Sequence, residues 1–95
     1  MINLLIADDH PLVRGGLKQI IETTPDIVVA GEAAQGSEVI EKLRTCQVDL
    51  LLLDMTMPGI SGVDLIRRVR AERPSLPILV LSIHNEAQVV SRALR

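Results

Sequence analysis

Residues 48–54 read Val-Asp-Leu-Leu-Leu-Leu-Asp, an apolar run that ends in an acid. Similar runs occupy Ile2–Ala7, Ile27–Ala30 and Leu76–Leu81, beside this one at Val48–Leu53. All four are nearly continuous in Leu, Ile and Val, a pattern typical of parallel strands that are covered on both faces. Their starts, near residues 2, 27, 48 and 76, have the spacing that repeated strand–helix–strand units require. The sequence therefore predicts a doubly wound α/β domain built on a parallel sheet.

Apolar residues at helical spacing fill the intervals between the predicted strands. In chain order these stripes are Val13, Leu17, Ile20 and Ile21; Val39, Ile40 and Leu43; Leu65, Ile66 and Val69; and a weaker one at Ala87, Val90 and Leu94. Pro11 suits the first turn of the first helix. Ser37 is a candidate N-cap of the second helix, and Ser61 with Asp64 resembles a capping box for the third. We therefore expect a helix after each strand.

The composition is that of a globular protein, with 47% hydrophobic and 23% charged residues and no aromatic side chain. A net charge of −2 and a pI near 5.6 argue against nucleic-acid binding by this segment, because phosphate contacts require a basic excess and base stacking requires aromatic rings. No apolar run approaches the roughly 18 residues of a membrane span, and the acidic N-terminal stretch is not a secretory signal. The single cysteine, Cys46, suits a reducing compartment. We expect a cytoplasmic domain without a membrane partner.

Acidic and hydroxyl side chains follow three of the four apolar runs. Asp8 and Asp9 follow the first, Asp54 follows the third, and Ser82 follows the fourth. Ligands of an open parallel sheet bind beyond the carboxyl ends of its strands, so these side chains are expected to converge. Each has an ordinary structural explanation by itself, since Asp and Ser often cap helices or form turns.

Together, the three carboxylates indicate a cation site. They would repel one another unless a cation lay among them. Oxygen ligands select a hard ion, and Mg²⁺ typically takes one or two carboxylates while keeping several waters. A magnesium ion beside a carboxylate nucleophile suits phosphoryl transfer, in which an Asp forms an acyl phosphate. Ser82 can then donate a hydrogen bond to a phosphoryl oxygen.

These residues resemble the receiver domains of two-component response regulators. The pair Asp8-Asp9 resembles the family's acidic pair, and residues 54–62, Asp-Met-Thr-Met-Pro-Gly-Ile-Ser-Gly, resemble its phosphorylation loop. Residues 79–82, Leu-Val-Leu-Ser, resemble the strand that ends in the switch Ser or Thr. Two stretches resemble sequences of the NarL/FixJ-type (LuxR-class) subfamily. They are residues 8–14, Asp-Asp-His-Pro-Leu-Val-Arg, and residues 81–84, Leu-Ser-Ile-His.

The resemblance implies that Asp54 accepts phosphate from a sensor histidine kinase. Asp8, Asp9 and Asp54 would hold Mg²⁺ together with the backbone carbonyl of Thr56, and Ser82 would move toward the phosphoryl group. The chain would then be a signalling phosphoacceptor, not an enzyme, and would form a homodimer on activation.

The resemblance also implies a flavodoxin-like sheet with strand order 2-1-3-4-5. The fifth strand would start at about residue 100, so this strand, its helix, and the family's lysine and aromatic switch residue would lie past residue 95. We interpret residues 1–95 as an incomplete receiver domain of a longer protein; a deliberately shortened chain and a natural end at Arg95 are the alternatives. Members of the subfamily typically carry a C-terminal helix-turn-helix domain, so DNA would be bound only through a domain absent here.

Two other functions stay open. One is a receiver-shaped interaction module that is not phosphorylated. The other is a phosphatase with an aspartyl nucleophile of the haloacid-dehalogenase type, which is disfavoured because the stretch Asp54-Met55-Thr56 lacks that family's second Asp.

Three smaller features have structural interpretations. His10 is read as a helix-start residue and not as a metal ligand, since Mg²⁺ prefers oxygen. Cys46 is read as a small core residue. A basic cluster is read as a solvated helix face; its members are Arg67, Arg68, Arg70 and Arg73.

Overall fold

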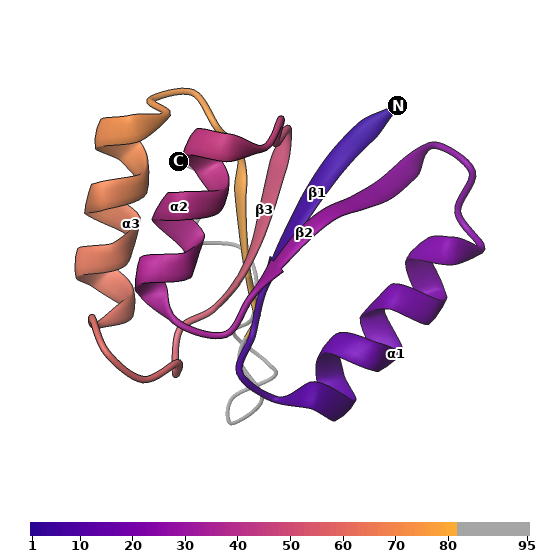
Figure 1. The fold of residues 1–95 in the computed structure, drawn as a ribbon, viewed down its shortest axis with the longest axis horizontal. Coiled ribbons are helices and arrows are strands. Elements are labelled where there is room, and N and C mark those ends of the chain that lie inside the picture. The colour runs from indigo at the N-terminus through magenta and orange to yellow at the C-terminus, as the bar shows by residue number, and fades with distance from the viewer. Residues whose placement is uncertain (82–95) are drawn as a thin grey trace.

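The four apolar runs form the four strands of one sheet in a computed structural model that describes residues 1–81 (Figure 1). In chain order the elements are β1 (Ile2–Ala7), α1 (Pro11–Glu22), β2 (Ile27–Ala33), α2 (Gly36–Thr45), β3 (Leu50–Asp54), α3 (Gly62–Glu72) and β4 (Ile78–Leu81). All strand pairs are parallel, in the order β2-β1-β3-β4. The predicted fold class is therefore confirmed, together with the part of the predicted strand order that falls within these residues. Ser82 and the predicted fourth helix lie outside the described residues.

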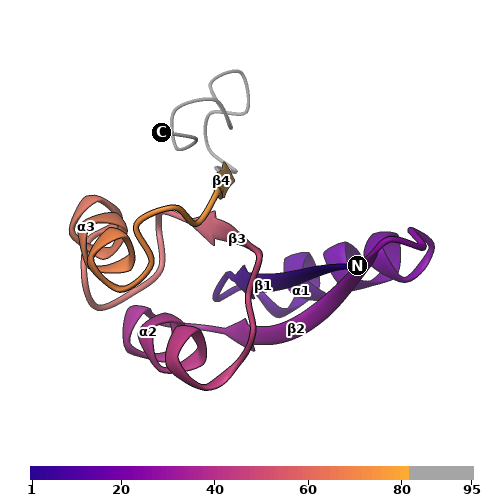
Figure 2. The same ribbon diagram turned by 90° about the horizontal axis from the view of Figure 1, so that it is seen from above.

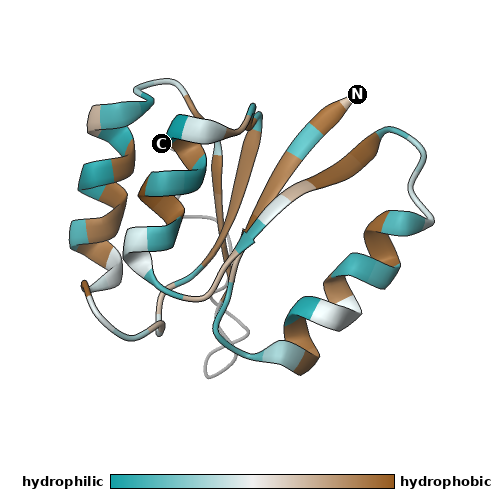
Figure 3. Cartoon of the chain, in the orientation of Figure 1, coloured by the Kyte–Doolittle hydropathy of each residue, from teal (hydrophilic) through white to brown (hydrophobic). Residues whose placement is uncertain are grey.

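The helices cover the sheet on both faces. Helix α1 lies on one face, while α2 and α3 lie side by side on the other, as two perpendicular views show (Figures 1 and 2). The strands between them are hydrophobic along most of their length (Figure 3). This arrangement accounts for the continuous apolar runs, because a strand that is covered on both faces has no side facing water.

The core is divided by the sheet into two clusters of unequal size. The larger cluster lies under α2 and α3 and includes Leu5, Leu51 and Leu53, with Val39 and Val69 from the helices. The smaller cluster lies under α1; its buried members are Leu4, Ile6, Ile21 and Leu52. Alternate residues of the same strand thus belong to opposite clusters, as the two-residue period of a strand requires.

Several predicted element boundaries were wrong. Strand β2 extends to Ala33 because Gly31, Glu32 and Ala33 continue to pair with β1, whereas the sequence suggested an end at Ala30. Strands β3 and β4 begin two residues later than predicted, because Val48 and Leu76 are buried beside the sheet without belonging to a strand. Burial of an apolar residue does not by itself make it part of a strand.

The helix starts were predicted correctly in two cases of three. Pro11 occupies the first turn of α1, and the Ser61 side chain caps α3 by accepting a hydrogen bond from the backbone N–H of Asp64 (3.2 Å). Ser37, however, is not a cap, because α2 begins one residue earlier, at Gly36. Near this start a Glu38 carboxylate oxygen instead accepts a hydrogen bond from the backbone N–H of Ala34 (2.6 Å).

Two predictions about single side chains also need correction. Ile20, assigned to the apolar stripe of α1, is 64% exposed, because the neighbouring Ile21 points to the sheet instead. The basic cluster is not uniformly solvated, since Arg70 donates to the carbonyl of Leu76 and Arg73 donates to the carbonyl of Val48 (2.7 Å). These two arginines tie the end of α3 to the segments that enter β3 and β4.

Cys46 fits its prediction. It follows the last turn of α2 as a partly buried residue packed against the larger cluster. Among helices within residues 1–81, none has the length and apolar character needed to cross a membrane.

Candidate metal centre

The carboxyl ends of β1 and β3 bring the predicted acids together. Ala7 pairs with Leu53 at the ends of these neighbouring strands, Asp8 follows Ala7, and Asp54 is the last residue of β3. Asp8 and Asp54 are buried, whereas Asp9 is partly exposed. One potential ligand atom from each of Asp8, Asp9, Asp54 and His10 lies within 4.8 Å of all the others. We call these four residues the acidic cluster.

The two oxygens of Asp54 have different surroundings. Oδ1 accepts hydrogen bonds from the backbone N–H of Thr56 (2.9 Å) and from its hydroxyl (2.7 Å). Oδ2 is buried and accepts no hydrogen bond from any residue that the structure describes. Oδ1 therefore fixes the orientation of the carboxylate, and Oδ2 is left pointing into the acidic cluster.

His10 contacts all three acids of the cluster. Its Nδ1 lies 2.8 Å from Asp8 Oδ1, 3.2 Å from Asp9 Oδ1 and 3.5 Å from Asp54 Oδ2. The hydrogen bond to Asp8 raises the pKa of His10 above its ordinary value, and the negative charges of the three acids act in the same direction. His10 also donates its backbone N–H to Asp8 Oδ1 (2.8 Å), so Asp8 holds both the main chain and the ring.

Basic side chains of α1 form hydrogen bonds and ion pairs near the main chain of Asp8. The Arg14 guanidinium donates to the backbone carbonyl of Asp8 and to Glu32 Oε1 (3.1 Å), and the ammonium of Lys18 donates to Glu32 Oε2 (2.9 Å). The hydrogen bond from Lys18, aided by the charges of Lys18 and Arg14, lowers the pKa of Glu32. The start of α1 is thereby tied to β2 at the edge of the sheet where the acids meet.

The loop after Asp54 is shaped by burial at one residue and by glycine at another. Met57 is buried in the larger core cluster, which anchors the middle of the loop. Gly59 has φ +96°, a conformation that side chains with a Cβ rarely adopt. The loop therefore turns back at Gly59 and enters α3 through the capping residue Ser61.

The donor set fits Mg²⁺. Hard cations take carboxylate oxygens, and two such oxygens of the cluster, Asp9 Oδ1 and Asp54 Oδ2, are buried and accept no hydrogen bond from the described residues. A cation at this position would offset the repulsion among three close carboxylates.

The structure brings together Asp8, Asp9 and Asp54, three of the residues singled out in the sequence. Thr56 is beside them through its N–H and hydroxyl, while the metal-ligand role of its carbonyl stays a prediction. Sequence reasoning read His10 as a helix-start residue and not as a metal ligand, and no signal in the sequence placed its ring at this site.

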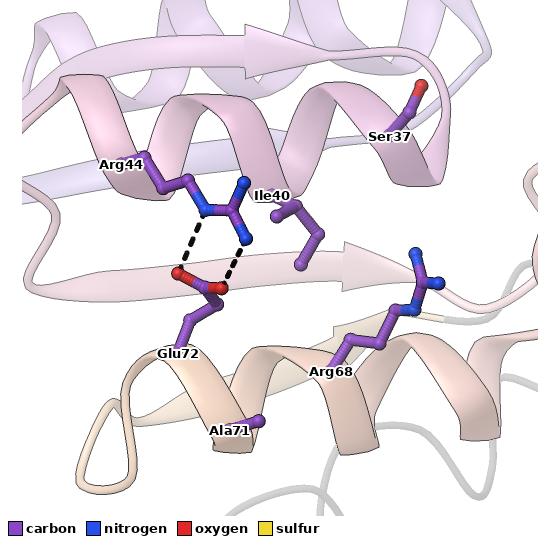
Figure 4. A pocket seen from close by; sticks show the side chains of 6 residues that line it. All are labelled: Ser37, Ile40, Arg44, Arg68, Ala71 and Glu72. Atoms are coloured by element: carbon purple, nitrogen blue, oxygen red, sulfur yellow. Dashed lines mark hydrogen bonds and ion pairs between the residues drawn. The ribbon is translucent and has the colours of Figure 1, made fainter.

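Away from the acidic cluster, a hollow with a volume of about 340 Å³ lies between α2 and α3. It is lined by Ser37, Ile40, Arg44, Arg68, Ala71 and Glu72 (Figure 4). Arg44 donates two hydrogen bonds to Glu72 across it, at 3.1 and 2.6 Å. The hydrogen bonds from Arg44 lower the pKa of Glu72, and those to Glu72 raise the pKa of Arg44. Because this pair joins the two helices, we interpret the hollow as a feature of helix packing.

The fold and the acidic cluster define an α/β domain with a flavodoxin-like sheet and a carboxylate site at its carboxyl edge. A family model described as the response regulator receiver domain matches residues 4–95. The chain belongs to this family, as the sequence predicted.

Three comparisons place the chain near regulators of the predicted subfamily. It is 38% identical over 95 residues to the response regulator UvrY of Escherichia coli (strain K12), covering 100% of this chain and 44% of the relative. It is 41% identical over 92 residues to the nitrate/nitrite response regulator protein NarL of the same strain, covering 97% and 43%. The crystal structure of the non-phosphorylated receiver domain of the stress response regulator RcsB from Escherichia coli superposes with a TM-score of 0.84 at 33% identity, covering 92% of this chain and 69% of that one. The chain thus spans less than half the length of the curated relatives it matches.

Proposed function

We propose that this domain is a phosphorylation switch in which Asp54 accepts a phosphoryl group from a sensor histidine kinase in the presence of Mg²⁺. The observation that carries the proposal is the asymmetric setting of Asp54. Thr56 holds Oδ1, while the buried Oδ2 faces Asp8 and Asp9 without a hydrogen bond from the described residues. An oriented carboxylate with one free oxygen is what a nucleophile requires.

In the proposed step, the Asp54 carboxylate attacks the phosphorus of a phosphohistidine. The new O–P bond forms as the P–N bond breaks, and the leaving imidazole keeps the electron pair and takes a proton from solvent. Bound Mg²⁺ would offset negative charge on the transferring oxygens. Asp8 and Asp9 would hold that ion with Asp54 and the Thr56 carbonyl, and the Ser82 hydroxyl would donate to a phosphoryl oxygen of the product.

Incubation of the protein with acetyl phosphate and Mg²⁺ tests the assignment, with intact mass as the readout. We expect the addition of one phosphoryl group to wild type and none to Asp54→Asn. Asp49→Asn is the matched control, because Asp49 precedes the same strand at the opposite edge of the sheet, and it should be labelled like wild type. Labelling of Asp54→Asn at the wild-type level would refute the assignment.

The competing function, a receiver-shaped module that is not phosphorylated, makes a different prediction for the metal. Calorimetric titration should detect Mg²⁺ binding at millimolar concentration if the acidic cluster is a working site, and Asp8→Asn should weaken it. An aspartyl phosphatase is not favoured, because Thr56 stands where that family's second Asp would be.

We propose transcription as the output, with the kinase docking on α1. The relatives' names, which describe response regulators, support a regulatory role, and their greater length leaves room for the predicted C-terminal helix-turn-helix domain. On α1, Leu12 is 90% exposed and Ile20 is 64% exposed, so the helix presents apolar side chains to a partner. Homodimer formation on activation and a cytoplasmic location complete the proposal.

A further inference from the structure

His10 lies at ligand-like spacing from the acids of the cluster. In an octahedral site with bonds of roughly 2.0–2.1 Å, adjacent ligand atoms lie about 3 Å apart. The separations of His10 Nδ1 from one oxygen of each acid, 2.8, 3.2 and 3.5 Å, bracket that value. The ring nitrogen therefore stands where a fourth ligand to an ion shared by the three carboxylates would stand.

A second observation, independent of the acidic cluster's composition, indicates that a ligand belongs there. Asp54 is only 2% exposed, and its Oδ2 points into the cluster without accepting a hydrogen bond from residues 1–81. A buried carboxylate oxygen without a donor is costly, so the position calls for a positively charged partner.

The His10 ring is held by its hydrogen bond to Asp8 and not by packing, so an ion can compete for its nitrogen. The backbone of His10 is held at the start of α1 by the hydrogen bond to Asp8 Oδ1, which fixes the Cα beside the site. The side chain itself is 45% exposed, so packing does not lock the ring. A small rotation can turn Nδ1 from a hydrogen bond with Asp8 toward an ion held by the carboxylates.

We propose that His10 is a nitrogen ligand that extends the metal range of this site from Mg²⁺ to first-row transition ions such as Co²⁺ and Ni²⁺. Imidazole suits these ions, whose affinity for mixed nitrogen and oxygen sites exceeds that of Mn²⁺, whereas Mg²⁺ is bound through carboxylates and water. His10 thus contributes to binding of Co²⁺ and not of Mg²⁺. The inference rests on the metal site of the proposed function, but not on phosphorylation of Asp54.

Binding of Co²⁺ and of Mg²⁺ to the full chain tests the inference, by visible absorption for Co²⁺ and by calorimetry for both. We expect His10→Ala to weaken Co²⁺ binding by about tenfold or more, and to change Mg²⁺ binding by less than about twofold. Gln19→Ala, at an exposed position of α1, is the control and should bind both ions like wild type. Asp54→Asn should weaken the binding of both ions.

The outcomes separate this inference from the proposed function. Wild type that binds neither ion contradicts the metal site itself. Wild type that binds Mg²⁺, with equal Co²⁺ affinity in His10→Ala, overturns only the role of His10. Equal weakening of both ions in His10→Ala would show a general supporting role and would also overturn selectivity.

A measurement on the unaltered chain guards against a folding defect in the variant. Proton NMR resolves the two histidine rings, and Co²⁺ is paramagnetic. We expect Co²⁺ to shift or broaden the ring resonances of His10, which are identified by their absence from the spectrum of His10→Ala. Ring resonances of His10 that Co²⁺ leaves unchanged would contradict coordination by His10.

Discussion

Asp54 is a buried carboxylate that lies close to two others and has one oxygen without a hydrogen bond from the described residues. Each of these properties disfavours the folded state, because burial penalises a charge and like charges repel. Thr56 donates hydrogen bonds to Oδ1 but none to Oδ2. The acidic cluster therefore lowers the stability of the domain when no cation is bound.

Replacing Asp54 with Asn should stabilise the folded chain in the absence of divalent ions, by about 1 kcal/mol. The Asn carbonyl can still accept both hydrogen bonds from Thr56, while its amide group can donate to the neighbouring carboxylates. Urea unfolding in the presence of a chelator measures the change. Asp26→Asn, at an exposed position, should stay within about 0.5 kcal/mol of wild type. A less stable Asp54→Asn variant would contradict the electrostatic argument.

The convergence of Asp8, Asp9 and Asp54 was predictable, because parallel strands that end at one edge bring their next residues together. The place of His10 was not. Its ring reaches the acids because Asp8 accepts a hydrogen bond from the backbone N–H of His10, which directs the turn into α1. That turn is set by one side-chain contact, and the spacing of residues along the sequence carries no sign of it.

At the level of elements, the two serine caps that the sequence suggested differ in the structure. Ser61 caps α3, so Ser61→Ala should lower the free energy of unfolding by about 1 kcal/mol. Ser37 lies inside the first turn of α2 and caps nothing, so Ser37→Ala should change stability by no more than about 0.5 kcal/mol. Chemical unfolding of the two variants compares them directly. Equal losses would mean that the assigned start of α2 is wrong.

The contact between α1 and β2 depends on the charge of Glu32. Lys18 and Arg14 lower the pKa of this carboxyl, so its ion pairs stabilise the fold at neutral pH. Because the folded pKa is below the unfolded one, the stabilisation is complete above about pH 4.3 and disappears as the pH falls through the lowered value. Glu32→Gln should therefore be less stable than wild type at pH 7, by less than about 1 kcal/mol because the pair is partly exposed. Urea unfolding from pH 7 to pH 3 measures this difference, which should shrink at the acid end; a constant difference would contradict the linkage.

The hydrophobic runs indicate that the strands are covered on both faces, but they do not indicate how tightly each face is packed. Leu50, Leu51, Leu52 and Leu53 look equivalent in the sequence. In the structure, Leu51 and Leu53 face the larger cluster under α2 and α3, while Leu50 and Leu52 face the smaller one under α1. The difference depends on how the helices within residues 1–81 are shared between the two faces of the sheet, which the sequence of one strand does not show (Figure 2).

This asymmetry predicts unequal costs for neighbouring leucines of β3. Leu51 is fully buried, so Leu51→Ala should lower the free energy of unfolding by about 3–5 kcal/mol through lost contacts and a cavity. Leu50 is only partly buried against the smaller cluster, so Leu50→Ala should cost about 1–2 kcal/mol. Denaturant unfolding of both variants, with similar dependence on denaturant concentration, provides the comparison. Equal costs would mean that the face under α1 is packed as tightly as the face under α2 and α3, and the division of the core described here would have to be revised.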